Sequence, residues 1–320
     1  MEPQKEPNPN DLPYPSQPQP TGDEIDVREL FNFLWKGKWI IIATTFIFAI
    51  GSVLYALSLP NIYKADALLA PVESSNAGGL SKMAGQLGGL AALAGVSLSN
   101  AGVSQTELAV QVIKSRQFID EFISKHDLLL PLMATRDWDL VNNKLIIDKK
   151  LYDPVSDKWI REPVGLRGAE PSAQEAFQVF TKEVLTIKLD KDTGLYKLSV
   201  EHYSPYVAKQ WVNWLIDDIN KVMRERAIKE ATQNLIYLNT QLGKTSVADM
   251  QSTFYKLIEE QTKSLMLAEV QEEFIFKIID PAVVPEMKYE PKRALICILG
   301  TLLGGMFGIL FLFCRFIIKR

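Results

Sequence analysis

Apolar and charged positions are distributed very unevenly along the chain. Two runs, 39–59 and 294–314, contain no charged residue and are each about 21 residues long. A helix of that length spans roughly 30 Å, the thickness of the hydrocarbon core of a bilayer. The pattern predicts two membrane-spanning helices. A cleaved signal peptide is not expected, because the first run is too long and follows an acidic, proline-rich segment.

Charged residues beside the first run predict its orientation. Arg28, Lys36 and Lys38 precede it, and only Lys64 lies close behind it. Positive charge is enriched on the cytoplasmic side of membrane helices, so the N-terminus is expected in the cytoplasm. The expected organisation comprises a disordered proline-rich tail, a juxtamembrane segment, the first span, a translocated domain, the second span and a cytoplasmic tail: 1–22, 23–38, 39–59, 60–293, 294–314 and 315–320.

The translocated segment mixes strand and helix patterns, which predicts an α+β domain. Alternation with a period of two predicts a strand over 62–72, a hairpin over 185–203 that turns at Asp192-Thr193-Gly194, and a returning strand over 274–279. Apolar spacing and start signals predict three shorter helices: 106–126, 138–149 and 172–184.

Residues 204–273 are expected to be almost entirely helical. The first helix would contain about 38 residues and extend roughly 55 Å, which exceeds the core radius of a domain of this size. It should therefore project beyond its own core. Two apolar stripes with coiled-coil spacing form a predicted helix seam, for which another copy of the chain is expected to be the nearest partner. The seam residues are Leu235, Leu238, Leu242, Phe254 and Leu257.

The segment 74–102 is a low-complexity tract of Gly, Ala, Leu and Ser. Its most apolar part, 87–98, is too short to cross a membrane. Several glycines also weaken any helix there, by about 1 kcal/mol each. We interpret the tract as a mobile loop; a segment that touches the membrane surface or lines the interior of an oligomer is the alternative.

A proline-rich connector precedes the second span. Pro281, Pro285 and Pro291 cannot continue a central strand and restrict the backbone, so they predict a stiff, extended segment. Lys292 and Arg293 follow at the expected level of the lipid headgroups.

Glycines recur every fourth residue in the second span. Gly300, Gly304 and Gly308 share one helix face, which permits close approach of another helix. Ser52 and Ala56 present a matching small-residue face in the first span. We predict that the two spans pack against each other through these faces; a neighbouring subunit or a partner protein is the alternative.

The remaining chemistry of the chain argues against catalysis. A net charge of −3 gives no indication of nucleic-acid binding, and both cysteines, Cys297 and Cys314, lie within the second span. His126 and His202 each stand alone, without metal-ligand spacing. Gly243-Lys244-Thr245 lacks the first glycine of a phosphate-binding loop. No metal, cofactor or enzymatic activity is expected, and the absence of ionisable residues within the spans argues against a transporter.

Three stretches carry a resemblance to a known family: DEIDVRELFNFLWKGKW (23–39), IYKADALLAP (62–71) and FKIIDPAVVP…EPKRALICILGTLLGG (276–305). They are similar to the Wzz-type polysaccharide co-polymerases, which determine the chain length of O-antigen and related bacterial polysaccharides. Members of this family often carry a further proline between Pro285 and Pro291, where this chain has Glu286-Met287-Lys288.

The resemblance implies a protein of the bacterial inner membrane whose termini are cytoplasmic and whose main domain is periplasmic. That domain would be an α/β base carrying a long protruding helix, and several copies would form a ring. The ring would act with a Wzy-type polymerase on a lipid-linked polysaccharide such as the O-antigen of lipopolysaccharide. Since only six residues follow Cys314, without a Walker motif or tyrosine cluster, the non-kinase class is expected.

Two other functions remain open from the sequence. The same architecture could serve as an adaptor for export of exopolysaccharide or capsule. A two-span sensor that binds a periplasmic ligand is the second alternative, but it would need a cytoplasmic output domain.

Overall fold

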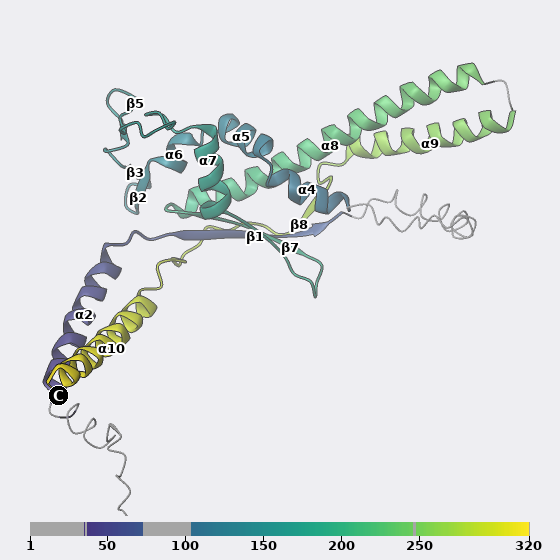
Figure 1. Ribbon diagram of the computed structural model, residues 1–320. Coiled ribbons are helices and arrows are strands. Elements are labelled where there is room, and N and C mark those ends of the chain that lie inside the picture. Colours follow the sequence, from purple (N-terminus) through teal and green to yellow (C-terminus); the bar gives the residue numbers. More distant parts are fainter. Residues whose placement is uncertain (1–34, 36, 73–103, 246–247, 320) are drawn as a thin grey trace, which may run out of the picture. The chain divides into compact units, whose positions relative to one another are not determined.

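The computed structural model describes residues 35, 37–72, 104–245 and 248–319 (Figure 1). The chain divides into two compact units. One holds the helices α2 (Lys38–Ser58) and α10 (Arg293–Lys319), and the other runs from Ser58 to Lys292. The tail 1–22 and the tract 74–102 lie outside the described residues. Both α2 and α10 are long and apolar enough to cross a membrane.

The second unit is built on a four-stranded antiparallel sheet. Its order is β6 (Leu185–Leu189), β7 (Tyr196–His202), β1 (Tyr63–Pro71) and β8 (Phe276–Asp280). The predicted strands and the predicted hairpin are confirmed. The hairpin turns at Gly194, whose φ of 72° lies in the left-handed region that glycine adopts without strain.

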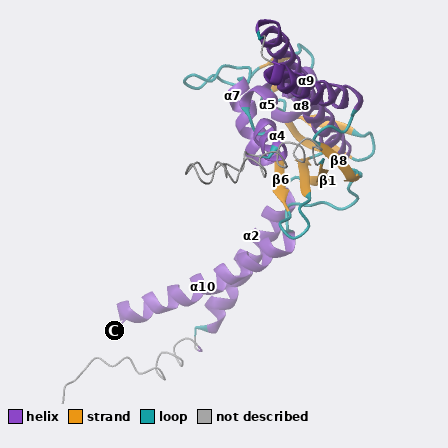
Figure 2. Cartoon of the chain, turned by 90° about the vertical axis from the view of Figure 1, so that its right-hand side faces the viewer, coloured by secondary structure: helices purple, strands orange, loops and turns teal. Residues whose placement is uncertain are grey.

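One face of the sheet carries the hydrophobic core. Side chains alternate along β1, so Ala65, Ala67 and Leu69 are buried while the residues between them face the other way. Leu198 and Val200 of β7 extend the same face. The helices α4, α5, α7 and α8 lie on this side of the sheet (Figure 2). The opposite face is therefore free to carry polar side chains.

The predicted helix 106–126 is two helices. They are α4 (Gln105–Ile113) and α5 (Arg116–Lys125). Ser115 separates the two helices. Its hydroxyl donates to the carbonyl of Val112 at 2.7 Å and accepts from the amide of Phe118 at 3.3 Å. A serine that caps a new helix competes with continuation of the old one, and the apolar spacing did not reveal this.

The prediction of a helix over 138–149 is wrong. The structure has a short hairpin of β2 (Thr135–Asp139) and β3 (Lys144–Ile147). Asp139 accepts hydrogen bonds from the amides of Val141 and Asn142 at 2.8 and 3.3 Å. Asn143 adopts a φ of 49°. Asp and Asn stabilise turns in this way, and here the turn chemistry outweighs the helical spacing.

Short elements complete the base of the unit. They are α6 (Leu129–Met133), β4 (Tyr152–Asp153), β5 (Lys158–Trp159), α7 (Ala173–Val179) and a π-helical turn (Phe180–Val184). The predicted helix at 172–184 is confirmed, with Ser172 and Glu175 forming a capping box. Glu175 also accepts a bidentate ion pair from Arg161 at 2.7 and 2.9 Å, which attaches the preceding loop to α7.

The helix α8 (Pro205–Lys244) has 40 residues, close to the predicted length. Its buried residues lie between Pro205 and Met223, and Ala231 is the single buried residue beyond them. The outer half therefore projects from the core, as predicted. The chain reverses at the end of α8, and α9 (Ala248–Val270) returns along it as an antiparallel hairpin (Figure 1).

This hairpin corrects the predicted partner of the helix seam. Within the chain, α9 packs along α8 and covers the seam that was predicted to need another copy. The five seam residues are half-buried: Leu235, Leu238, Leu242, Phe254 and Leu257. Asn234 donates to Gln261 across the pair at 3.4 Å. Because the chain reverses between the two stripes, each stripe covers the other.

Candidate functional site

The glycines of α10 lie against α2 at very short range. A Cβ added to Gly300 would lie 2.3 Å from the Cβ of Ser52. One added to Gly304 would lie 2.6 Å from the Cβ of Phe48, and one added to Gly308 would lie 2.4 Å from the hydroxyl oxygen of Thr44. No real Cβ fits at such distances. The glycines therefore set the separation of the two helices.

The α2 side of this contact differs in part from the predicted face. Ser52 lies at the contact as expected, and Ala56 is buried. Phe48 was not predicted at this contact, because the expected face consisted of small residues. Its ring stacks on Phe307 with centroids 5.6 Å apart. Positions 44, 48, 52 and 56 are spaced four residues apart. The spacing of the contact was therefore predictable, but the participation of a large residue was not.

The proline-rich connector is attached to the beginning of β1. The amide of Ile62 donates to the carbonyl of Glu290 at 2.9 Å, and the amide of Tyr289 donates to the carbonyl of Ile62 at 2.8 Å. The connector holds Pro281, Pro285 and Pro291 and ends at Lys292, and Arg293 is the first residue of α10. Backbone hydrogen bonds thus join the first and the last residues of the second unit.

A buried asparagine fixes the strand that leads into this connector. Asn220 of α8 accepts from the amides of Ile275 and Phe276 at 2.9 and 3.0 Å. Its amide group donates to the carbonyl of Phe276 at 3.0 Å. One side chain therefore pairs three buried backbone groups, and it anchors the first residues of β8 to the long helix.

The α8–α9 hairpin still exposes large apolar side chains after its seam is covered. They are Ile236, Tyr237, Met250, Tyr255, Met266 and Val270. Part of this face forms an open hollow of about 560 Å³ lined by Met266, Leu267 and Val270 together with polar neighbours. Exposed apolar surface of this kind marks contact sites with other molecules.

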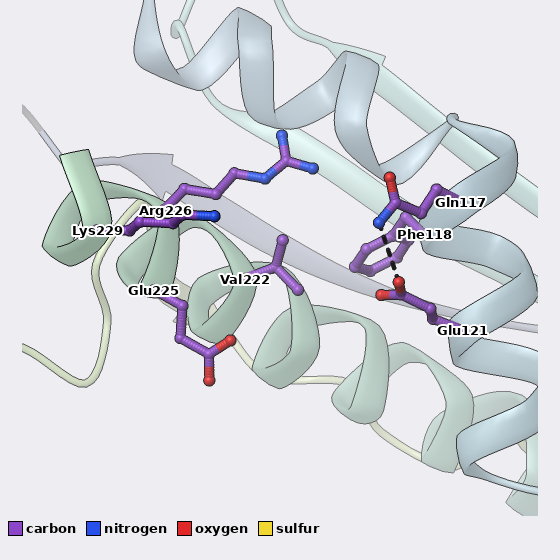
Figure 3. A pocket seen from close by; sticks show the side chains of 7 residues that line it. All are labelled: Gln117, Phe118, Glu121, Val222, Glu225, Arg226 and Lys229. Atoms are coloured by element: carbon purple, nitrogen blue, oxygen red, sulfur yellow. Dashed lines mark hydrogen bonds between the residues drawn. The ribbon is translucent and has the colours of Figure 1, made fainter. Parts of the chain in front are cut away.

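A polar groove lies between α5 and α8. It has a volume of about 250 Å³ and is lined by Gln117, Phe118, Glu121, Val222, Glu225, Arg226 and Lys229 (Figure 3). Gln117 donates to Glu121 at 3.0 Å across one turn of α5. The groove is lined by both acidic and basic side chains, which could hydrogen-bond to a polar ligand. Its lining residues include no nucleophile paired with a base.

The residue after α5, His126, contacts α8. Its Nε2 lies 2.8 Å from Asp218, and its ring stacks on Trp214 with centroids 4.2 Å apart. The neighbouring Lys125 forms an ion pair with Asp218. Burial raises the pKa of the adjacent Asp217 carboxyl, and the charge of Asp218 adds to this effect. The geometry describes a structural clamp between two helices.

The other histidine, His202, is buried and neutral. Its Nδ1 accepts from the amide of Ser204 at 3.0 Å, so its Nε2 carries the proton and donates to the carbonyl of Pro131 at 3.2 Å. Burial lowers the pKa of His202 from 6.5 to about 4, against the contact with the carbonyl of Pro131, which raises it. The imidazole therefore stays uncharged in the folded protein at neutral pH.

This burial predicts a loss of stability in mild acid. The unfolded chain takes up the proton near pH 6.5, whereas the folded chain resists until about pH 4. The stabilisation is complete above pH 6.5 and is lost as the pH falls toward 4, with a loss of about 2 kcal/mol at pH 5. The melting temperature of the detergent-solubilised full chain should fall accordingly between pH 7.5 and 5. In the variant H202Q this fall should shrink, whereas H126Q should keep it; equal falls in all three proteins would contradict the assignment.

Two parts of the chain match models of known protein families. Residues 23–126 match the family model described as Wzz, chain length determinant protein. Residues 244–317 match the model described as GNVR, G-rich domain on putative tyrosine kinase. The chain therefore contains a chain length determinant domain and a GNVR domain. The first match covers the segment before α2 as well as α2, β1, α4 and α5, and the second covers α9, β8, the connector and most of α10.

Two solved structures are also similar to this chain. A full-length bacterial polysaccharide co-polymerase is 14% identical with a TM-score of 0.37, and the match covers 92% of this chain and 98% of that one. A fragment of WzzB, a polysaccharide co-polymerase from Salmonella Typhimurium, is 10% identical with a TM-score of 0.28 over 72% of this chain and 100% of the fragment. No curated protein matches the chain.

The fold of the chain agrees with the predicted class. It is a mixed α and β unit with one very long helix, and it lies between two apolar helices in the sequence. The Gly243-Lys244-Thr245 sequence forms the last turn and the cap of α8, not a loop between a strand and a helix. Its location agrees with rejecting it as a phosphate-binding loop.

Proposed function

We propose that this protein is a non-enzymatic scaffold that sets the preferred length of a lipid-linked surface polysaccharide, such as the O-antigen of lipopolysaccharide. It would act with a Wzy-type polymerase. The match of residues 23–126 to the chain length determinant family carries the proposal. The described side chains support the non-catalytic part, since the groove between α5 and α8 and the histidine contacts show binding and packing groups.

In this proposal α2 and α10 cross the bacterial inner membrane. Residues 39–59 and 294–314 would be the two spans, 60–293 the periplasmic domain, and 1–38 and 315–320 cytoplasmic. The apolar length of both helices supports the crossing, and the positive charges before α2 support the orientation. The mutual packing of α2 and α10 through Gly300, Gly304 and Gly308 supports a helix pair within one subunit.

Several copies of the chain would form a ring. The support is the exposed apolar face of the α8–α9 hairpin, which includes Tyr237, Met266 and Val270. A second copy would cover this face, and the seam residues Leu235, Leu238, Leu242, Phe254 and Leu257 would hold each hairpin rigid. We also propose that the protein belongs to the non-kinase class. The description of the second matching model mentions a tyrosine kinase, but that word refers to other proteins that carry the domain.

Deletion of the gene tests the function. We expect a polysaccharide ladder with a preferred length to become a broad distribution, since polymerisation would continue without its regulator. An unchanged ladder would reject the proposal. Loss of surface polysaccharide with an unchanged ladder would instead indicate an export adaptor.

The mass of the complex extracted in detergent from complemented cells tests the ring. The variant M266E places a charge on the exposed hairpin face and should lower the mass of the detergent-extracted complex. The control S252E carries the same new charge on α9 at an exposed polar position and should keep the wild-type mass. A monomeric wild-type protein would contradict the ring directly.

A further inference from the structure

A second polar pocket lies on the face of the sheet opposite the core. Its volume is about 380 Å³, and residues of β1, β6, β7 and the connector line it. Lys64 and Asp66 line it, and they alternate along β1 with the core residues Ala65 and Ala67. The pocket belongs entirely to the second unit.

The pocket carries an excess of positive charge. Lys64 pairs with Glu201 at 3.1 Å and lies 4.4 Å from the ring centroid of Tyr289. Lys197 pairs with Asp66. The other two lysines of the lining, Lys188 and Lys288, are exposed and make no ion pair among the residues that the structure describes. Two ammonium groups therefore remain available to an anion.

The strand register places like charges together. Lys188 of β6 lies directly opposite Lys197 of β7. Like charges in this position destabilise a sheet; Asp66 offsets the charge of Lys197, whereas Lys188 makes no ion pair among the described residues. An anion bound between the two strands would remove the repulsion.

Short chain segments connect this pocket to the two helices that are proposed to cross the membrane. Lys64 follows the last residue of α2, Ser58, by six residues, and Lys288 precedes the first residue of α10, Arg293, by five. Six extended residues reach about 20 Å. The apolar side chain of Met287 is 85% exposed beside Lys288, and Tyr289 is partly exposed. Lysine next to aromatic and apolar side chains is typical of a membrane interface.

We propose that this pocket binds the phosphate of an anionic phospholipid headgroup at the membrane surface, with Lys188 and Lys288 as its main contacts. Exposed ammonium groups on flexible stems suit a headgroup in a fluid bilayer. A site built for the diphosphate of a lipid-linked glycan would be expected to hold its donors in fixed positions, as arginine forks or backbone amides do. The inference rests on the proposed membrane crossing of α2 and α10 and not on control of glycan length.

Binding of a short-chain lipid to the full chain in neutral detergent tests the proposal. Dihexanoyl phosphatidylglycerol is the probe, titrated by calorimetry, and dihexanoyl phosphatidylcholine is its zwitterionic counterpart. The variant K188Q/K288Q should bind phosphatidylglycerol about thirtyfold more weakly than the wild type, while K188R/K288R should keep the affinity. The control K150Q/K158Q removes the same charge from exposed positions outside the pocket and should bind as the wild type.

Three outcomes would overturn the proposal. The first is equal affinity of the wild type and K188Q/K288Q. The second is an equal loss in K150Q/K158Q, which would show a general charge effect. The third is strong, lysine-dependent binding of farnesyl diphosphate with none of phosphatidylglycerol, which would assign the pocket to a diphosphate lipid. Polysaccharide length plays no part in the measurement, so failure here leaves the proposed function intact.

Discussion

The variant N220L should lower the melting temperature of the second unit by about 10 °C. Leucine has a similar size but cannot pair the amides of Ile275 and Phe276 or the carbonyl of Phe276. Each buried backbone group left unpaired costs about 1–3 kcal/mol, so the total loss is on the order of 3–5 kcal/mol. In a unit of this size, 1 kcal/mol corresponds to about 2–4 °C.

Thermal unfolding of the full chain in mild detergent, followed by circular dichroism, measures this effect. The matched control is N239L, which makes the same replacement at an exposed position of the same helix. It should change the melting temperature by no more than about 2 °C. A similar fall in both variants would show that the loss comes from leucine on α8 and not from the three backbone contacts. Because β8 leads into the connector, N220L should also loosen the junction with α10.

The variant G304L should disturb the packing of α10 against α2. Even a Cβ at Gly304 would lie 2.6 Å from the Cβ of Phe48 and 3.0 Å from the Cα of Thr45, which is backbone and cannot rotate away. The helix α2 must therefore move by about 1 Å or more, at a cost on the order of 1–3 kcal/mol of packing.

Complementation of the gene deletion measures the consequence for length control. We expect G304L to be expressed and inserted but to shift or broaden the preferred polysaccharide length. The control G51L places the same side chain in α2 at a position where an added Cβ meets nothing within 4 Å. It should complement as the wild type does. Wild-type lengths from G304L would mean that close approach of α2 and α10 has no part in the function.

Particular elements show how far sequence patterns reach. The strand over 62–72 and the hairpin at Gly194 were predictable because alternation and turn chemistry agree there. At 138–149 they disagree: the apolar spacing favours a helix, but Asp139 and Asn143 stabilise a turn. Local hydrogen bonds decided that segment, and a pattern of apolar positions does not contain them.

The candidate sites show the same division. The glycine face of α10 was predictable from its four-residue period, but Phe48 as its neighbour was not, since the rotation of α2 about its axis depends on the packed pair. Asn220 gave no signal at all. Its three partners lie 55 and 56 residues away in the chain, and only the fold brings them together.

The sequence by itself determined the two uncharged apolar runs, the α+β domain between them and the length of the long helix. These properties follow from composition and periodicity, which act over a few residues. Only the tertiary structure decided that α9 covers the seam of α8, that Ile62 pairs with Glu290, and that Lys188 faces Lys197. Those contacts join distant segments, and their geometry depends on the packing of the whole unit.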